Sequence, residues 1–398
     1  MPEPTQHPIL LTFALAVGAF AIGTAEFAAM SLVPYFASDL KLTEPEAGHA
    51  ISAYALGVVV GAPVIAVLGA RLARRTLLIG LMVMFAMGNG LSALAPTYHV
   101  LLLFRFLSGL PHGAYFGVAA LVAASLVPPH KRAQSVARVM SGLTVATIIG
   151  VPAANWLGQL VGWRSGFVVV AILALLTVAL VAIYAPHARA APGASPLREL
   201  GALRRPQVLL TLLTGAIGFG GLFCVYTYVA STMIEVTGVS ERLVPLVLAV
   251  FGVGLTAGNL FWAWMADRKL NRAAISAMLF SAGALALFPF AAGNIWFLTV
   301  DILLIGFGGG LGTILQTRLM DVAGDAQALA AAAHHSAFNT ANALGPWLGG
   351  LAISAGYGLR TTGWIGVALS LGGLAIYLVT IALHRRSEVR VTAQPQTV

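Results

Sequence analysis

The chain has 398 residues, of which 59% are hydrophobic and only 9% are charged, and its formal net charge is +9. Soluble domains carry about 25% charged residues, so this composition excludes an ordinary soluble protein. It predicts an all-α integral membrane protein instead. The single cysteine, Cys224, excludes an intramolecular disulfide.

A membrane-spanning helix needs about 20 consecutive apolar residues, so a chain of this length has room for roughly twelve spans. In chain order the hydrophobic segments are 9–36, 46–70, 76–95, 98–126, 133–158, 164–185, 207–234, 241–266, 273–292, 295–322, 328–353 and 361–384.

The basic residues gather in alternate loops, on the side that holds both termini. Most of the 22 Lys and Arg residues, Arg318 among them, are assigned to these loops. The positive-inside rule then puts both termini in the cytoplasm. The positive net charge therefore orients the chain in the lipid bilayer and requires no nucleic-acid partner.

The chain divides into two similar parts. Residues 186–206 are rich in Pro and Arg and predict a cytoplasmic linker between an N-terminal half, 1–185, and a C-terminal half, 207–398, that ends in a short cytoplasmic tail. Each half holds six spans, and the halves repeat a hydropathy pattern. Such a repeat is typical of a transporter whose site lies between the halves.

The repeat extends to particular residues. The turn AVLGARLARR, 66–75, follows the second span, and AWMADRKLNR, 263–272, follows the eighth. Aligning Gly113 with Gly309 puts Arg105 opposite Asp301.

Several segments are similar to those of one transporter family. The chain resembles the major facilitator superfamily, in its twelve-span drug:proton antiporter branch, and most of all the bacterial sugar-efflux (arabinose-efflux-type) permeases. This resemblance implies two six-helix halves related by a pseudo-two-fold axis, alternating access and a monomer. The segments that carry it are GTAEFAAMSLVP (23–34), SAYALGVVVGAPV (52–64), RFLSGLPHGAYFG (105–117), GLTVATIIGVPAANWLGQLVGWR (142–164) and HHSAFNTANALGPWLGG (334–350).

The chain departs from the family's pattern in two places. In the turn after the second span, Ala66 and Ala70 stand where the family has Gly and Asp, although the basic residues remain. In the fifth span the antiporter signature is interrupted, and its small residues fit either close packing or a hinge. The residues expected to brace or gate one conformation are Arg71, Arg74, Arg75, Gly150, Pro152, Asp267 and Arg268.

Few ionisable residues fall inside the spans, and they are candidates for proton coupling. Glu26 is the only charged residue between Ile9 and Phe36, and an ionised carboxylate at bilayer depth costs at least ~2.5–3.5 kcal/mol. We hypothesise that Glu26 and Arg105 share a site whose charge follows proton and substrate occupancy. The alternative is a protonated Glu26 that only hydrogen-bonds a neighbouring helix.

Two further residues remain open between function and structure. His112 suits a proton shuttle, because its unperturbed pKa is near neutral, but it also suits a hydrogen bond between helices. Asp301 is either a second coupling acid or a residue near the headgroups.

A polar stripe in the eleventh span predicts substrate contacts. His335, Asn339 and Asn342 lie on one helical face, and amides offer both donors and acceptors, although they also join neighbouring helices. His334 and His335 point to different faces, so no metal site and no cofactor are predicted. The remaining candidates for the pocket, which are equally ordinary bundle residues, are Tyr54, Tyr115, Phe116, Phe223, Tyr226, Phe338 and Gln316.

These observations favour a secondary active transporter that exports a small molecule in exchange for protons. A proton symporter for uptake has the same architecture, and a sensor or scaffold without transport is a third possibility. An enzyme is not expected, because the chain has no H-E-x-x-H, G-x-S-x-G or Walker motif. The substrate stays open among sugars, nucleosides, amino-acid derivatives and drugs.

Overall fold

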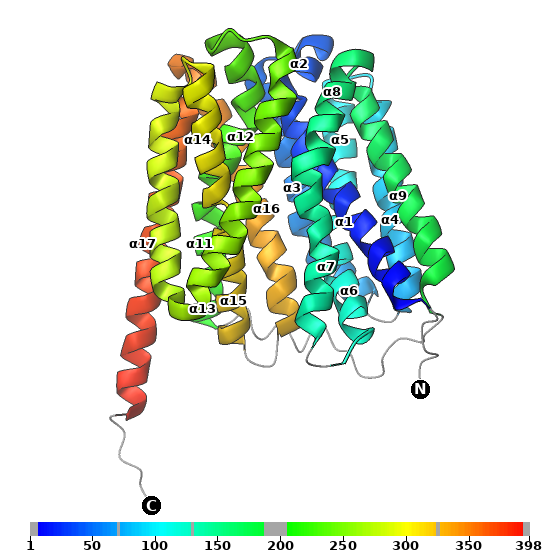
Figure 1. The fold of residues 1–398 in the computed structure, drawn as a ribbon, viewed down its shortest axis with the longest axis vertical. Coiled ribbons are helices and arrows are strands. Elements are labelled where there is room, and N and C mark those ends of the chain that lie inside the picture. Colours follow the sequence, from blue (N-terminus) through cyan, green and yellow to red (C-terminus); the bar gives the residue numbers. More distant parts are fainter. Residues whose placement is uncertain (1–6, 70–71, 129–130, 187–204, 324–326, 393–398) are drawn as a thin grey trace, which may run out of the picture.

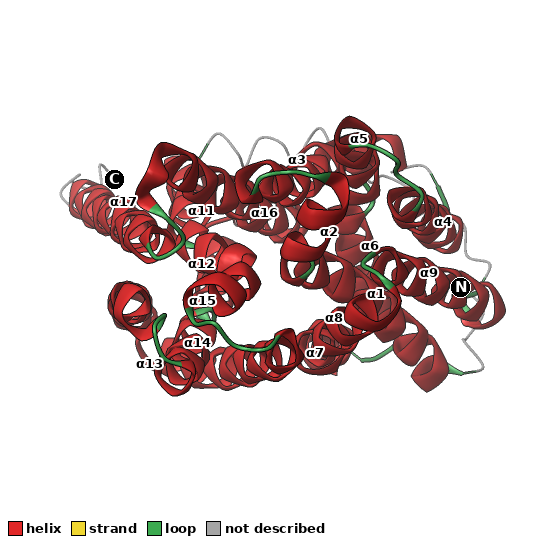
Figure 2. Ribbon diagram, turned by 90° about the horizontal axis from the view of Figure 1, so that it is seen from above, coloured by secondary structure: helices red, strands yellow, loops and turns green. Residues whose placement is uncertain are grey.

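The structure is a computed structural model, which describes residues 7–69, 72–128, 131–186, 205–323 and 327–392. Within these ranges the chain forms helices, turns and loops and no strands (Figure 2). The helices run side by side along one axis (Figure 1). In lipid this is expected, because a helix satisfies its backbone hydrogen bonds internally.

The helices of the proposed N-terminal half are α1 (Pro8–Ser31), α2 (Val33–Leu40), α3 (Glu44–Gly69), α4 (Arg74–Ala93), α5 (Tyr98–Gly109), α6 (His112–Ser125), α7 (Arg132–Val145), the π-helical turn η2 (Ala146–Gly150), α8 (Val151–Val161) and α9 (Arg164–Tyr184). Those of the C-terminal half are α11 (Pro206–Gly218), α12 (Gly220–Ser231), η4 (Thr232–Val236), η5 (Glu241–Leu243), α13 (Val244–Ala291), α14 (Ile295–Gly308), α15 (Leu311–Ala323), α16 (Gln327–Ala352), η6 (Ile353–Tyr357) and α17 (Thr361–Thr392). Most of the expected linker lies outside the described residues.

Ten helical segments of the described chain are long and apolar enough to cross a membrane. One of them, Glu241–Ala291, contains two predicted spans, which meet at the non-helical Lys269. The predicted eleventh span falls on α16, which is not among the ten. Helices therefore cover the main part of all twelve predicted spans.

Four predicted spans are each broken into two helices, which corrects their expected continuity. The first, 9–36, is interrupted at Leu32, and the fourth, 98–126, at Leu110 and Pro111. A proline lies at each junction, since Pro34 is the second residue of α2 and Pro111 directly precedes α6, and proline has no N–H to continue the hydrogen-bond ladder of the preceding helix. In the seventh and tenth spans, 207–234 and 295–322, the breaks fall within glycine-rich stretches.

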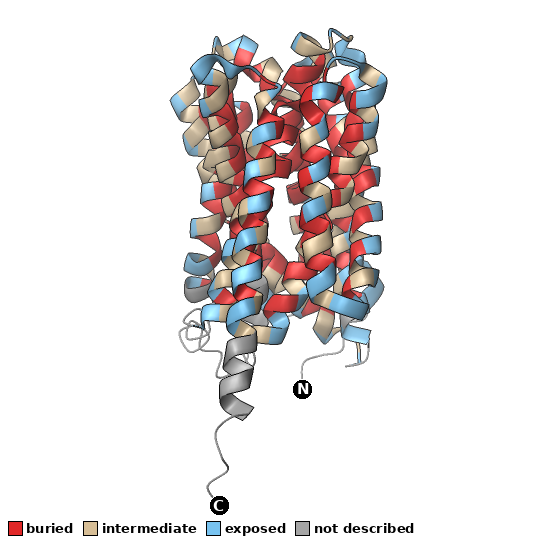
Figure 3. Ribbon diagram, turned by 90° about the vertical axis from the view of Figure 1, so that its left-hand side faces the viewer, coloured by how far each residue is buried: buried red, intermediate tan, exposed pale blue. Residues whose placement is uncertain are grey.

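The outer surface of the bundle is apolar. Figure 3 shows buried residues on the sides of the helices that face each other and exposed residues on the outside. Many exposed residues are large and hydrophobic, among them Leu68, Phe290 and Trp296. A surface of this kind marks contact with lipid.

Two hydrophobic clusters organise the core. One lies entirely within residues 11–185, whereas the other joins both halves. In the second cluster the Phe27 ring of α1 contacts Phe223 and Tyr226 of α12 and Phe251 of α13. Figure 2 shows α3 and α16 side by side where the halves meet, and these two helices are in extensive contact.

The hydrogen bonds between the halves avoid one end of the bundle. We call the end where α1 begins and α17 ends the terminal face, and the other end the opposite face (Figure 1). Near the opposite face Ser231 Oγ donates to Glu44, Gln159 donates to the Glu241 carbonyl at 2.8 Å, and deeper in the bundle Ser52 Oγ donates to the Ala343 carbonyl at 2.9 Å. In the described part of the chain no hydrogen bond joins the halves at the terminal face.

The bracing residues expected in the loops do not join the halves among the described residues. Arg75 donates to the Ala182 carbonyl of its own half, and Arg268 lies over the Trp264 ring, 4.0 Å from its centre. Arg74 and Asp267 are exposed. Arg71 lies outside the described residues, so the expected latch stays a prediction.

Arg318 is not a loop residue, contrary to the expectation from charge distribution. It lies within α15, only 5% exposed. Its guanidinium donates to Asn271 Oδ1 at 3.3 Å and to Gln207 Oε1 at 3.0 Å, and it lies over the Tyr377 ring. These amide oxygens allow a cation to enter the bundle without an acidic partner.

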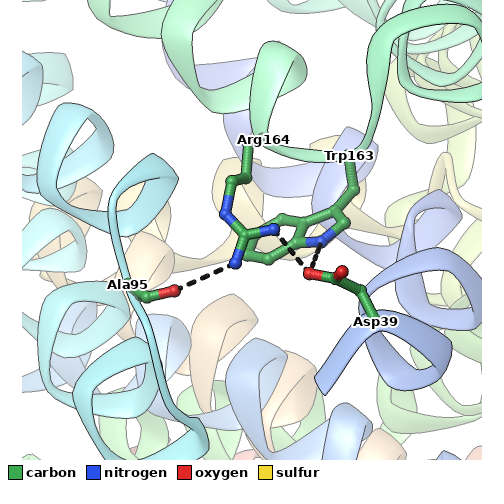
Figure 4. Close-up of polar contacts among 4 residues, drawn as sticks. All are labelled: Asp39, Ala95, Trp163 and Arg164. Atoms are coloured by element: carbon green, nitrogen blue, oxygen red, sulfur yellow. Dashed lines mark hydrogen bonds and ion pairs between the residues drawn. The ribbon is translucent and has the colours of Figure 1, made fainter. Parts of the chain in front are cut away.

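A polar clamp at the opposite face ties three segments of the N-terminal half (Figure 4). The Asp39 carboxylate accepts hydrogen bonds from Trp163 Nε1, at 3.0 Å, and from Arg164 Nη1, while Arg164 Nη2 donates to the Ala95 carbonyl. The Trp163 N–H and the Arg164 guanidinium stabilise the ionised form and so lower the pKa of Asp39 below its usual value of 3.8.

We predict that Gly109→Ala destabilises the protein. A methyl group on Gly109 would lie 2.1 Å from the Tyr54 carbonyl oxygen, so α3 and α5 would have to separate. Overpacking of this kind costs about 1–3 kcal/mol, which corresponds to a fall of several degrees in apparent melting temperature in detergent. The control is Gly117→Ala, where nothing lies within 4 Å, and equal melting temperatures of the two variants would contradict the prediction.

We also predict that Asp39→Asn has a small effect that depends on pH. Because the folded pKa of Asp39 is lowered, its contribution is fully present above the unfolded pKa, about 3.9, and is lost as the pH falls through the lower folded value. Both side chains of the ion pair are over 40% exposed, so the difference at pH 7 should stay below about 1 kcal/mol. Melting curves at pH 7 and pH 3 measure the difference, which should be smaller at pH 3, and a difference as large at pH 3 as at pH 7 would refute the assignment.

Candidate functional site

Glu26 is buried at the contact between the halves. It lies near the end of α1, 2% exposed, and its Oε1 accepts a hydrogen bond from Asn342 Nδ2 of α16 at 2.9 Å. These two residues are 316 positions apart in the chain. The carboxylate is therefore held by the opposite half, and not by a neighbouring helix of its own half.

Arg105 is buried nearby without a hydrogen bond of its guanidinium to any described residue. Its side chain is 0% exposed and lies over the rings of Tyr54, at 4.3 Å, and of Phe167, at 5.1 Å. Glu26 and Arg105 are near enough for their charges to interact, but they form no ion pair. Within the expected shared site, Glu26 and Arg105 thus occupy separate positions and interact only through the electrostatic attraction between their charges.

Tyr54 connects Arg105 to His112. The ring of Tyr54 faces the guanidinium, and its hydroxyl lies 2.9 Å from His112 Nδ1. His112 is the first residue of α6, after the break at Pro111. Arg105 and His112 therefore lie on successive helices, and a residue of a third helix, Tyr54, contacts both of them.

His335 contacts the N-terminal half across the interface. Its ring stacks on Phe116 with 5.0 Å between the ring centres, and the His112 ring lies 6.4 Å away. The His334 ring is nearly perpendicular to that of His335. Among the described residues no cluster of His, Cys, Asp and Glu has the arrangement of a metal site.

Several aromatic candidates meet in the inter-half cluster, together with two residues that sequence reasoning missed. Phe223 packs against Phe338 at 4.8 Å, and Tyr226 packs against Phe251 at 4.1 Å and Phe27 at 5.6 Å. Phe27 directly follows Glu26, which was the one available signal for it. Nothing in the sequence pointed to Phe251.

Other candidates lie apart from this cluster. The Tyr115 hydroxyl donates to the Leu15 carbonyl inside the N-terminal half, so Phe116, and not Tyr115, faces the other half. Gln316 is half-buried on α15. Asp301 is 3% exposed on α14, and its two carboxylate oxygens have no hydrogen-bond partner among the described residues.

The glycines of the fifth span pack closely on α1. A methyl group on Gly142 would lie 2.1 Å from the Ala16 carbonyl oxygen, and one on Gly150 would lie 2.3 Å from Thr24 Oγ1. Gly150 ends the π-helical turn η2, and Pro152 follows at the start of α8. Close packing accounts for these small residues, and a hinge at this turn stays a prediction.

The two asparagines on α16 present the same group. Asn339 Nδ2 donates to the His335 carbonyl of its own helix at 3.1 Å, and Asn342 Nδ2 donates to Glu26. Both side-chain oxygens are buried and have no partner in the described part of the chain. The expected polar stripe thus offers two unpaired acceptors, while each Nδ2 already donates one hydrogen bond.

The sequence as a whole matches known membrane transporters. The model of the Major Facilitator Superfamily matches residues 15–240 and 223–397. The chain is 40% identical to the inner membrane transport protein YdhP of Escherichia coli K12, over 96% of this chain and 97% of that protein. It is 30% identical to a probable sugar efflux transporter of Pasteurella multocida, over 94% and 92% of the respective chains.

The fold is also known. A solved structure of a bacterial homologue of the human lysosomal transporter Spinster, in an inward-facing and unoccupied conformation, superposes with a TM-score of 0.72. It covers 94% of this chain and 97% of its own, at 15% identity, and so concerns the fold alone. The expected family, the twelve-span architecture and the absence of an enzymatic role are confirmed. The chain belongs to the major facilitator superfamily of membrane transporters.

Proposed function

We propose that this transporter exports a small molecule from the cytoplasm in exchange for protons by alternating access. The observation that carries the proposal is the buried Glu26 carboxylate on α1, hydrogen-bonded to Asn342 of the other half. A titratable group at this position changes its charge where the two halves must separate and rejoin. Intramembrane carboxylates of this kind are typical of proton relays.

The surroundings of Glu26 suit such a cycle. Arg105 is a buried cation whose donors have no partner among the described residues, so its charge is compensated only by aromatic rings and by Glu26 at a distance. A change in the charge of Glu26 therefore alters the energy of Arg105. The Tyr54 ring faces Arg105 and its hydroxyl contacts His112, so we propose that Tyr54 couples the charge of Arg105 to the protonation of His112. His112 would then be a second proton-coupling residue.

The substrate would bind where the halves meet, among the aromatic and amide side chains. Phe116 and His335 approach from opposite halves, and Asn339 and Asn342 carry unpaired acceptors. Walls of this kind, apolar with few polar groups, are typical of small-molecule sites. We keep Tyr54, Phe223, Tyr226 and Phe338 as contacts, and Tyr115 and Gln316 as more distant candidates.

The distribution of contacts supports a state open to the cytoplasm. The basic loops lie at the terminal face, which we assign to the cytoplasm by the positive-inside rule. The hydrogen bonds between the halves lie near the opposite face or deep in the bundle, so the proposed external end is the closed one. The homologue of Spinster with the same fold was solved in an inward-facing conformation.

The remaining parts of the proposal follow from this arrangement. The halves 1–185 and 207–398 would rock as units about the site, joined by the linker 186–206. Asp301, buried in the tenth span without a hydrogen-bond partner among the described residues, would be a second coupling acid. Export agrees with the relative named as a probable sugar efflux transporter, and the protein would act as a monomer in the bacterial inner membrane.

We predict that Glu26→Gln abolishes coupling. The protein is reconstituted in liposomes that contain a pH dye, and sugars, nucleosides and drugs are each tested for substrate-driven proton flux. Gln keeps the size of Glu and a partner for Asn342 but cannot take up a proton, so flux should fall to the level of empty liposomes.

The matched control is Glu46→Gln, an exposed glutamate that accepts hydrogen bonds from Thr43 at the start of α3. It should leave proton flux unchanged. Flux that persists in Glu26→Gln would move the coupling site to His112 or Asp301. Proton flux in the direction of substrate entry would replace antiport by symport, and no flux with any compound would refute the proposal.

A further inference from the structure

The orientation of the Asn342 amide is determined by its partner. Asn342 donates through Nδ2 to Glu26 Oε1, and an ionised carboxylate only accepts hydrogen bonds. The amide therefore directs its nitrogen to Glu26, and its Oδ1 is left without a partner among the described residues. The side chain is 0% exposed, so this free acceptor is buried.

Protonation of Glu26 changes what this oxygen can do. A protonated carboxyl group carries one O–H donor, and a buried donor without an acceptor is costly. The Asn342 oxygen is an unpaired acceptor on the group already bonded to Glu26. An acid and an amide can then form a cyclic pair, in which Nδ2 still donates to one carboxyl oxygen and the new O–H donates to Oδ1.

We propose that Asn342 Oδ1 is a shared acceptor for which the substrate and the coupling proton compete. When Glu26 is ionised, a hydroxyl or N–H group of the substrate donates to this oxygen. When Glu26 is protonated, its own O–H occupies the oxygen and the substrate loses that bond. This inference rests on the proposed antiport and adds that the substrate must carry hydrogen-bond donors.

Asn339 provides an internal comparison one turn earlier on the same helix. Its Nδ2 donates to the His335 backbone carbonyl, which does not titrate, and its Oδ1 is equally buried and unpaired. The state of Asn339 is therefore independent of Glu26. Asn339 should contribute to substrate affinity, whereas Asn342 should contribute to both affinity and coupling.

Other ionisable groups around the pair must be considered. Among the described residues Arg105 is the one whose charge acts on Glu26. Arg132 and Arg138 of α7 are exposed, and Asp39 of α2 belongs to the clamp at the opposite face. Ionisable side chains on the other elements in this region include Tyr54 on α3, His112 and Tyr115 on α6, Tyr226 and Tyr228 on α12, and His334 and His335 on α16.

Infrared difference spectroscopy of the substrate-free protein tests the pair directly. Spectra at high and low pH, with and without ¹³C-labelled asparagine, should show a protonated carboxyl band that is lost in Glu26→Gln. They should also show a shifted asparagine carbonyl band that is lost in Asn342→Leu and kept in Asn339→Leu. A Glu26 band without an asparagine shift, or a shift that survives Asn342→Leu, would overturn the inference and leave antiport intact.

A transport assay gives a second test that distinguishes the role of Asn342 from that of Asn339. With a compound that drives proton flux in the native protein, Asn339→Leu should weaken apparent affinity roughly three- to ten-fold, the effect of one lost hydrogen bond, at an unchanged ratio of protons to substrate. Asn342→Leu should lower that ratio, and Asn342→Gln, which keeps an amide, should restore part of it. Equal ratios of protons to substrate in Asn339→Leu and Asn342→Leu would overturn the inference. If the infrared spectra showed no protonation of Glu26 at any pH, the proposed function would be refuted as well.

Discussion

The contact between the Glu26 carboxylate and the Asn342 amide is the constraint around which the centre of this bundle is arranged. It joins α1 to α16 across the two halves, deep among apolar side chains. A charged group at this depth is costly, and the hydrogen-bond partner of Glu26 belongs to the other half. Any movement that separates the halves here must break the hydrogen bond between Glu26 and Asn342. For this reason we connect the carboxylate to proton exchange.

The interruptions in four spans decide which side chains reach the centre. Pro111 lies between α5 and α6, so Arg105 and His112 are on different helices, and Tyr54 contacts both of them. Close glycine contacts, such as Gly109 against the Tyr54 backbone, hold these short helices against α3. The candidate site thus depends on backbone breaks and on small residues as much as on its polar groups.

The two ends of the bundle are held differently. Hydrogen bonds between the halves gather near the opposite face, while at the terminal face the described polar residues bond within their own half, as Arg75 and Arg318 do. This asymmetry is the basis of the proposed state that is open at the terminal face. The clamp of Asp39, Trp163 and Arg164 differs from the contacts between the halves, because all of its hydrogen bonds lie within the N-terminal half.

Composition and hydropathy were sufficient to predict an all-helical membrane protein in two halves, because each membrane-spanning helix needs a long apolar segment and the hydropathy pattern repeats. The family was predicted from the segments that resemble it, such as GTAEFAAMSLVP at 23–34. Composition and hydropathy also singled out Glu26, Arg105 and the face of Asn339 and Asn342, because polar groups are rare in apolar segments. Only the tertiary structure decided which of these residues touch, since Glu26 and Asn342 are 316 positions apart and no local pattern relates them. The loop position expected for Arg318 was wrong for the same reason, because its amide partners come from distant helices that only the fold brings together.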